Sequence, residues 1–169
     1  AVGPSKSTYR VPSFSTLASS IVYQQLSGGA GGTVLKRLLL VAGVGEELQA
    51  GRILALGLDG MRHCGVSRQK ASYLLDLSAR SLDGSLVFDD LHTLSDDEII
   101  ARLTQVKGVG VWSAPMFLMF AMQRPDVLPT GDLGVRNAVQ RAYQLDAPPT
   151  PSPVGGVPGP GRPQAAVPP

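Results

Sequence analysis

The sequence has little cysteine, few aromatic residues and almost no excess of charge. One cysteine, Cys64, stands among 169 residues, which excludes an internal disulfide and an iron–sulfur cluster held by four cysteines. The two histidines, His63 and His92, add little material for a zinc centre. The longest apolar run, nine residues from Ala114 to Met122, is too short to cross a membrane, so no membrane partner is expected. A formal net charge of +2 does not by itself indicate a nucleic-acid binder.

What is present is enough apolar material for one folded domain, followed by a stretch of different composition. Apolar residues make up 43 % of the chain, which is typical of a globular protein. Residues 147–169 contain nine of the 14 prolines and no acidic or aromatic residue. Such a stretch buries too little apolar surface to offset its ordering entropy. We therefore predict a folded domain at residues 8–146 and a disordered Pro/Gly-rich tail at 147–169.

Apolar spacing predicts an all-α fold, a compact helical bundle. Phe14, Leu17, Ala18, Ile21 and Val22 follow the stripe of an amphipathic helix. Four further helices are expected after the glycine cluster at 28–32, at 54–63, at 112–123 with burial on all sides, and at 133–145. Another is expected to begin at Ser67, with its inner face formed by Ala71, Leu74, Leu75 and Ser78. The helix after the glycine cluster is expected to begin late or to fray, because each helical glycine costs up to about 1 kcal/mol relative to alanine. Ser95 and Glu98 form a capping-box pattern that opens a helix carrying Ile99, Ile100, Leu103 and Val106.

The segment from Leu103 to Trp112 predicts a helix, a glycine hairpin and a second helix. Gly108 and Gly110 flank Val109, so the backbone can turn tightly and approach a ligand closely. The N–H groups that open the second helix have no partner within it and form an anion site suited to one DNA phosphate. A glycine cap followed by an ordinary packed helix remains the alternative.

Four segments together resemble a known family: SIVYQQLS (20–27), CGVSRQKASYLLDL (64–77), LTQVKGVGVWSAPMFLMFAMQRPDVLP (103–129) and GDLGVR (131–136). They resemble the helix-hairpin-helix–GPD superfamily of DNA glycosylases, specifically the 3-methyladenine DNA glycosylase II branch. The resemblance implies a monomeric hydrolase of base excision repair that acts on alkylated purines in double-stranded DNA. It requires no cofactor. A nuclear location is expected from the tail's composition, or the cytoplasm and nucleoid if the source is bacterial.

By this match Asp132 is the catalytic residue. Cleavage of an N-glycosidic bond develops positive charge on the sugar, which a fixed carboxylate stabilises. Asp132 also stands at the start of the last expected helix, and a simple N-cap is the alternative. Trp112 occupies the position where several relatives carry a Schiff-base lysine, so we expect a monofunctional enzyme. Trp112 would stack on the flipped base beside Met116, for which core packing is the alternative.

The DNA contacts implied by the match come from two segments. Gln25 and Leu26 correspond to a wedge that fills the gap left by the flipped base. Lys107 and the hairpin residues Gly108, Val109 and Gly110 would contact a phosphate, with Arg136 and Arg141 nearby, although plain solvated charges are the alternative. Carbonyls of Thr104, Val106 and Val109 correspond to a monovalent-cation site. His63 and Cys64 are interpreted as structural.

Two departures from the family bear on activity. Pro115 stands where relatives often carry a polar pocket residue, which affects base preference. The family continues with a Trp- and Tyr-rich segment where this chain becomes rich in proline and glycine, so a partly uncovered core with weak or absent activity is expected. A non-catalytic helix-hairpin-helix module and an inactive truncated glycosylase are the competing interpretations.

Overall fold

The computed structural model describes residues 11–110, 112–124, 127, 133–145 and 147. The chain divides into two units, Ala1–Val127 and Leu128–Pro169. The first holds α1 (Phe14–Tyr23), α2 (Gly28–Ala42), α3 (Ala50–His63), α4 (Arg68–Leu82), α5 (Asp96–Leu103) and α6 (Ser113–Phe120), and the second holds α7 (Leu133–Tyr143). A 3-10 turn (Leu91–Thr93) and a two-stranded antiparallel ribbon, β1 (Gly43–Val44) with β2 (Glu47–Leu48), complete the described part. The predicted all-α class is confirmed.

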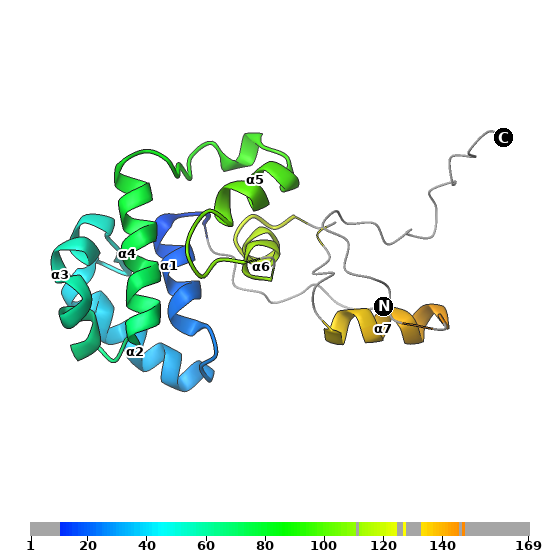
Figure 1. The fold of residues 1–169 in the computed structure, drawn as a ribbon, viewed down its shortest axis with the longest axis horizontal. Coiled ribbons are helices and arrows are strands. Elements are labelled where there is room, and N and C mark those ends of the chain that lie inside the picture. The colour runs from blue at the N-terminus through cyan, green and yellow to red at the C-terminus, as the bar shows by residue number, and fades with distance from the viewer. Residues whose placement is uncertain (1–10, 111, 125–126, 128–132, 146, 148–169) are drawn as a thin grey trace. The chain divides into compact units, whose positions relative to one another are not determined.

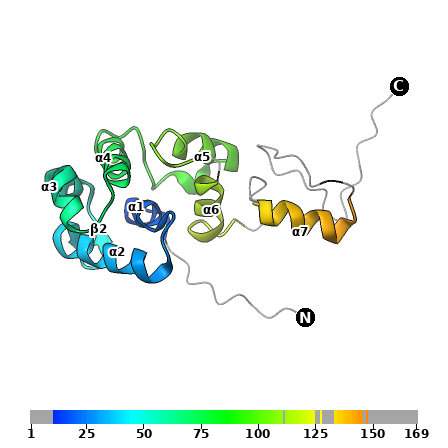
Figure 2. The same cartoon turned by 60° about the horizontal axis from the view of Figure 1, so that its bottom comes forward.

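The core of the first unit forms around α1, which lies between α4 and α6 in both views (Figures 1 and 2). Leu17, Ala18, Ile21 and Val22 are fully buried, as the apolar stripe predicts. None of the helices in the described part of the chain has the length and apolar character needed to cross a membrane. The first unit is therefore built around one buried helix, and the ends of that helix position the loops described below.

Serine residues start four of these helices. The side chains of Ser13, Ser27, Ser67 and Ser95 each accept a hydrogen bond from a backbone N–H in the first turn. At α5 the predicted capping box is complete, because the Glu98 carboxylate also accepts from the backbone N–H of Ser95. The predicted cap at Ser67 is likewise confirmed. On the inner face of α4, Leu77 is buried and Leu75 only partly so, which corrects the predicted inward set.

The expectation that the second helix begins late is wrong. It starts at Gly28, directly after its cap. A Cβ on Gly31 would collide with the ring of Tyr23, so glycine at this position lets α2 pack closely against the end of α1. Gly28 and Gly29 meet no neighbour. The propensity cost of Gly31 is thus offset by a tertiary contact that the local sequence does not show.

The bounds of three other helices also differ from the predicted ones. The third helix begins at Ala50 and bends at Gly57, whose φ of 64° is left-handed. The helix after Ser95 ends at Leu103, so Val106 is buried from the hairpin and not from the helix. The last helix of the first unit is shorter than predicted. It is not buried on all sides, because its N-cap Trp112 and its last residue Phe120 are half exposed.

The turn after α3 contains the two residues interpreted as structural. The Nδ1 atom of His63 donates to the carbonyl of Asp59, 2.8 Å away. Cys64 is buried, and burial raises the pKa of its thiol despite the nearby Arg37. Except for Ala147, the predicted tail lies outside the described residues, as does the expected domain boundary at Asp146, so the predicted domain division stays a prediction.

Candidate nucleic-acid interface

A hairpin joins α5 to α6, as predicted, and only one of its two glycines requires its residue type. Gly108 has a φ of 78°, and a Cβ there would collide with the ring of Tyr73 on α4. Gly110 has no neighbour within 4 Å of where its Cβ would be. Gly108 therefore shapes the hairpin against the protein, whereas Gly110 leaves the backbone open on its outer side.

The hairpin is held by a carboxylate that the sequence analysis did not identify. Asp76 on α4 accepts a hydrogen bond from the backbone N–H of Lys107 at 3.0 Å and another from Arg80 Nε at 3.0 Å. Burial raises the pKa of this carboxyl, but the Lys107 N–H and the Arg80 guanidinium outweigh it, so the pKa lies below its ordinary value. Asp76 therefore stays ionised while it fixes the hairpin to α4.

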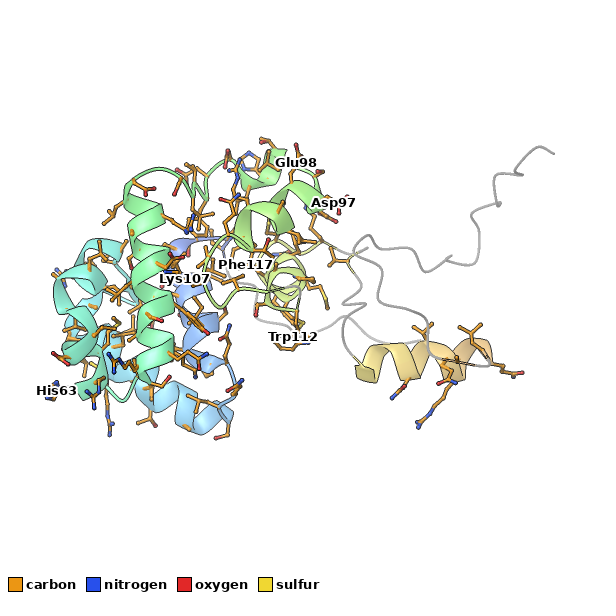
Figure 3. The ribbon with its side chains drawn as sticks, in the orientation of Figure 1. His63, Asp97, Glu98, Lys107, Trp112 and Phe117 are labelled. Atoms are coloured by element: carbon orange, nitrogen blue, oxygen red, sulfur yellow. The ribbon has the colours of Figure 1, made fainter. Side chains whose placement is uncertain are left out.

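Lys107 itself, the predicted phosphate contact, extends from the hairpin over α4 (Figure 3). Its Nζ lies 3.9 Å from Asp76 Oδ1, and the side chain is 69 % exposed. An exposed pair of this length contributes little to stability. The ammonium group can therefore turn to an incoming phosphate at small cost, and its role in DNA binding stays a prediction.

The predicted wedge lies at the end of α1. Gln25 is exposed and has a left-handed φ of 56°, which few residues other than glycine adopt. Leu26 is 40 % exposed. The preceding residue, Gln24, belongs to the same matched segment, but its contact with the hairpin was not predicted. Its Nε2 donates to the carbonyl of Gly108 at 2.9 Å and contacts Ser113 Oγ at 3.4 Å. The wedge and the hairpin are thus joined by one side chain.

A cavity of about 610 Å³ opens between the wedge and α6. Four residues predicted for the wedge and base pocket line it, namely Gln25, Leu26, Trp112 and Met116, so the structure brings them together. The other lining residues are Thr16, Ser20, Tyr23, Gln24, Ser113, Phe117, Phe120 and Ala121. The volume suits a small planar ligand, and pockets for such ligands are mostly apolar with a few polar groups. None of the described lining residues carries an acidic or basic side chain.

The predicted catalytic residue, Asp132, lies outside the described residues, and the same holds for the side chain of Arg136. The described part begins again at α7, which confirms the last predicted helix, and Arg141 is exposed on it. The catalytic assignment therefore rests on the sequence pattern.

The carbonyls predicted to hold a monovalent cation belong to Thr104 at the C-cap of α5, to Val106 in the following turn and to Val109 in the hairpin. The Val106 carbonyl accepts the N–H of Val109 at 3.1 Å, which leaves one lone pair for a ligand. Carbonyl oxygens are the donors that alkali-metal ions prefer, so the donor type fits. Within the described residues, no three His, Cys, Asp or Glu side chains gather in a way that could hold a metal ion.

Comparison with known proteins identifies the family. The sequence model of the HhH-GPD superfamily base excision DNA repair proteins matches residues 18–155. The chain belongs to this superfamily. The match spans the wedge, the hairpin and all the residues that line the pocket except Thr16. The resemblance inferred from the sequence is therefore confirmed, and so is the helix-hairpin-helix motif at the hairpin between α5 and α6.

Relatives with assigned names agree with one another. The chain is 30 % identical over 148 residues to DNA-3-methyladenine glycosylase 1 of Schizosaccharomyces pombe, covering 87 % of this chain and 65 % of that protein. It is 28 % identical over 138 residues to the putative DNA-3-methyladenine glycosylase YfjP of Bacillus subtilis, covering 79 % and 48 %. The chain thus spans about half to two thirds of the length of these relatives.

Two solved structures share the fold. The 3-methyladenine DNA glycosylase of Schizosaccharomyces pombe in complex with abasic DNA superposes with a TM-score of 0.69 at 29 % identity, covering 88 % of this chain and 72 % of that one. The DNA-3-methyladenine glycosidase of Bacillus halodurans gives 0.75 at 33 % identity, covering 83 % and 64 %. The arrangement of α1 to α6 around the hairpin is therefore a fold known from proteins that carry these names.

Proposed function

We propose that this HhH-GPD protein is a monofunctional DNA glycosylase of base excision repair that releases alkylated purines such as 3-methyladenine. The observation that carries the proposal is the cavity bounded by Gln25, Leu26 and Trp112 directly beside the hairpin. A pure phosphate clamp needs a hairpin but no cavity. Enzymes that act on a base must extrude it from the duplex into such a pocket.

Different residues would carry out the separate steps of DNA binding and base recognition. Backbone N–H groups at the start of α6 would hold a phosphate of double-stranded DNA, while Gln25 enters the stack and replaces the flipped base. The half-exposed face of Trp112 offers an electron-rich surface to the base. Because 3-methyladenine and 7-methylguanine carry positive charge in DNA, cation–π attraction favours them over normal purines. Met116, partly buried, completes the wall of the pocket.

The chemical step is assigned to Asp132. Its carboxylate would stabilise the oxocarbenium-like sugar as the base leaves, and water would then attack the sugar carbon. Trp112 and Ser113 follow the hairpin in place of an amine, so no Schiff base forms and the strand stays intact. We include a monovalent cation at the carbonyls of Thr104, Val106 and Val109, which would screen the bound phosphate. A monomer located in the nucleus completes the proposal.

Release of free bases from methylated duplex DNA tests this proposal. Wild-type protein should release 3-methyladenine, measured by chromatography, and Asp132→Asn should bind the same DNA while releasing at least a hundredfold less. Equal release by both proteins would remove Asp132 from the mechanism. Binding without release by either protein would leave a non-catalytic module, and failure of the wild type to melt cooperatively would indicate an inactive truncated glycosylase.

Borohydride trapping tests the monofunctional assignment separately. A Schiff base between a lysine and the sugar would be reduced to a stable protein–DNA adduct. We expect no adduct under conditions in which the wild type releases base. An adduct on a denaturing gel would contradict the assignment.

A further inference from the structure

Three exposed arginines and one exposed histidine gather around the turn that joins α3 to α4. Arg62 and His63 close α3, and Arg68 opens α4. Arg37 reaches the same turn from α2, because its Nη1 atom lies 3.7 Å from the position that a Cβ on Gly65 would occupy. All four side chains are exposed. We refer to Arg37, Arg62, His63 and Arg68 as the basic turn, and Figure 3 shows His63 at the edge of the unit away from Asp97 and Glu98 on α5.

The arginines of the basic turn are not neutralised by carboxylates of the described residues. The ion pairs found there use other cations, namely Arg80, Arg102, Lys107 and Arg124. The acid nearest in sequence, Asp59, contacts His63 through its backbone carbonyl. Guanidinium groups that make no ion pair with a carboxylate are suited to bind phosphate, through two parallel hydrogen bonds.

The helix that begins at the basic turn also holds the hairpin. Arg68 is the first residue of α4, and Asp76, which binds the Lys107 backbone, stands eight residues further along it. At a rise of about 1.5 Å per residue the two positions are about 12 Å apart along the helix axis. One strand of B-DNA advances about 3.4 Å per phosphate, so this distance corresponds to three or four nucleotides.

The same end of α4 is tied to the wedge. Lys70 Nζ donates to the carbonyl of Val22 at 2.7 Å, in the last turn of α1 before Gln25. Burial lowers the pKa of this ammonium group, which is consistent with a fixed structural contact. Wedge, hairpin and basic turn are therefore connected through two helices of the first unit.

We propose that Arg37, Arg62 and Arg68, with His63 at their edge, bind backbone phosphates of the duplex that the hairpin holds, about three or four nucleotides from the hairpin phosphate. The inference rests on the proposed function only in that duplex DNA occupies the hairpin. These contacts carry no base specificity, because phosphates are the same along every sequence. They add affinity for the arm of the duplex that lies along α4.

Salt dependence of binding tests the proposal without reference to catalysis. Affinity of the full chain for a 20-base-pair duplex with a central abasic-site analogue is measured by fluorescence anisotropy over a range of salt concentrations. Each lost phosphate contact should reduce the slope of log K against log salt by about 0.9 and weaken binding about eightfold at 0.1 M salt. Arg37→Gln, Arg62→Gln and Arg68→Gln are compared singly and combined. Arg102→Gln, which removes the same charge from a carboxylate-paired site, is the matched control.

A second series shortens the duplex from one end or the other. Wild-type protein should lose affinity when the arm along α4 is removed, and the triple variant should be insensitive to that removal. An unchanged slope in the triple variant, or a change no larger than that of Arg102→Gln, would overturn the proposal. Base release at saturating protein should be equal in the wild type and the triple variant. A wild type that releases no base would refute the proposed function and leave the binding result intact.

Discussion

The side-chain amide of Gln24 donates a hydrogen bond to the carbonyl of Gly108, 2.9 Å away and 84 residues further along the chain. It connects the residue before the wedge to the residue that turns the hairpin. In the proposed function, this hydrogen bond would keep a phosphate bound at the hairpin in a fixed position relative to a wedge inserted into the base stack. Positioning of this kind affects the flipped state more than the encounter with DNA.

Gln24→Ala should therefore slow base release more than it weakens binding. One hydrogen bond contributes about 1 kcal/mol, so we expect a five- to tenfold lower single-turnover rate and less than a twofold change in affinity for undamaged duplex. Fluorescence of 2-aminopurine at the flipped position gives an independent readout. Ser113→Ala, which removes only the 3.4 Å contact, is the control and should change little. Parallel loss of rate and affinity would contradict the positioning role.

The two hairpin glycines should respond differently to alanine. Gly108→Ala combines a left-handed φ with a collision against Tyr73, so we expect a loss of about 1–3 kcal/mol in the free energy of unfolding. Gly110→Ala adds a methyl group on the open side, so it should leave Tm unchanged while weakening DNA binding. Thermal melts and anisotropy measure the two effects. Tm values that fall equally would show that Gly110 is also structurally required.

Asp76 should stabilise the protein in a pH-dependent way. Its pKa in the folded state is lowered, so its contribution is fully present above the ordinary aspartate pKa and is lost as the pH falls through the folded value. Asp76→Asn should cost about 1–3 kcal/mol in urea unfolding at pH 7, and progressively less as the pH falls below the ordinary aspartate pKa. Asp97→Asn, at an exposed position on α5, is the control. If the stability difference between the wild type and Asp76→Asn were equally large in acid, the charge of Asp76 would not be its cause.

Trp112→Ala should change which bases are released. Loss of the indole removes about 1 kcal/mol of cation–π attraction, equivalent to about fivefold, from positively charged 7-methylguanine and less from neutral hypoxanthine. The residue is 48 % exposed, so stability should change little. Trp112→Phe should retain part of the preference. Equal losses in the release rates of both bases would show that Trp112 contributes only to the shape of the pocket.

Glycines at the start of α2 offer a stability test. Gly28→Ala and Gly29→Ala add methyl groups into open space and should each stabilise the helix, by up to about 1 kcal/mol. Gly31→Ala should destabilise, because its methyl group meets the Tyr23 ring. Tyr23→Ala in the Gly31→Ala background should recover part of the loss. A stabilising Gly31→Ala would show that α2 shifts to make room.

Local signals in the sequence predicted much of this fold, and tertiary contacts account for what they missed. Capping serines act within one turn, so Ser67 and Ser95 could be identified from neighbouring residues. The start of α2 could not, because it depends on Tyr23 packing against Gly31. The hairpin was predicted from its two glycines, and the wedge and two pocket residues, Trp112 and Met116, from the family pattern.

The supports of the site were not predicted. Gln24 and Asp76 bind backbone atoms of the hairpin that are 84 and 31 residues away. A backbone partner cannot be read from the sequence, since every residue type has the same carbonyl group and every residue type except proline has the same N–H group. A glutamine before the wedge and an aspartate within a helix therefore look like ordinary polar positions until the fold brings them to Gly108 and Lys107.

The burial of Cys64 affects how the protein tolerates the agents that create its proposed substrates. Methylating agents react with thiolates faster than with most protein groups, and this thiol is 6 % exposed with a raised pKa. The single thiol of the chain is therefore poorly accessible to such agents. Because Cys64 is buried, it should also react little with thiol-directed labelling reagents. A cysteine introduced at Gln25 could carry a fluorophore into the wedge without removal of the native thiol.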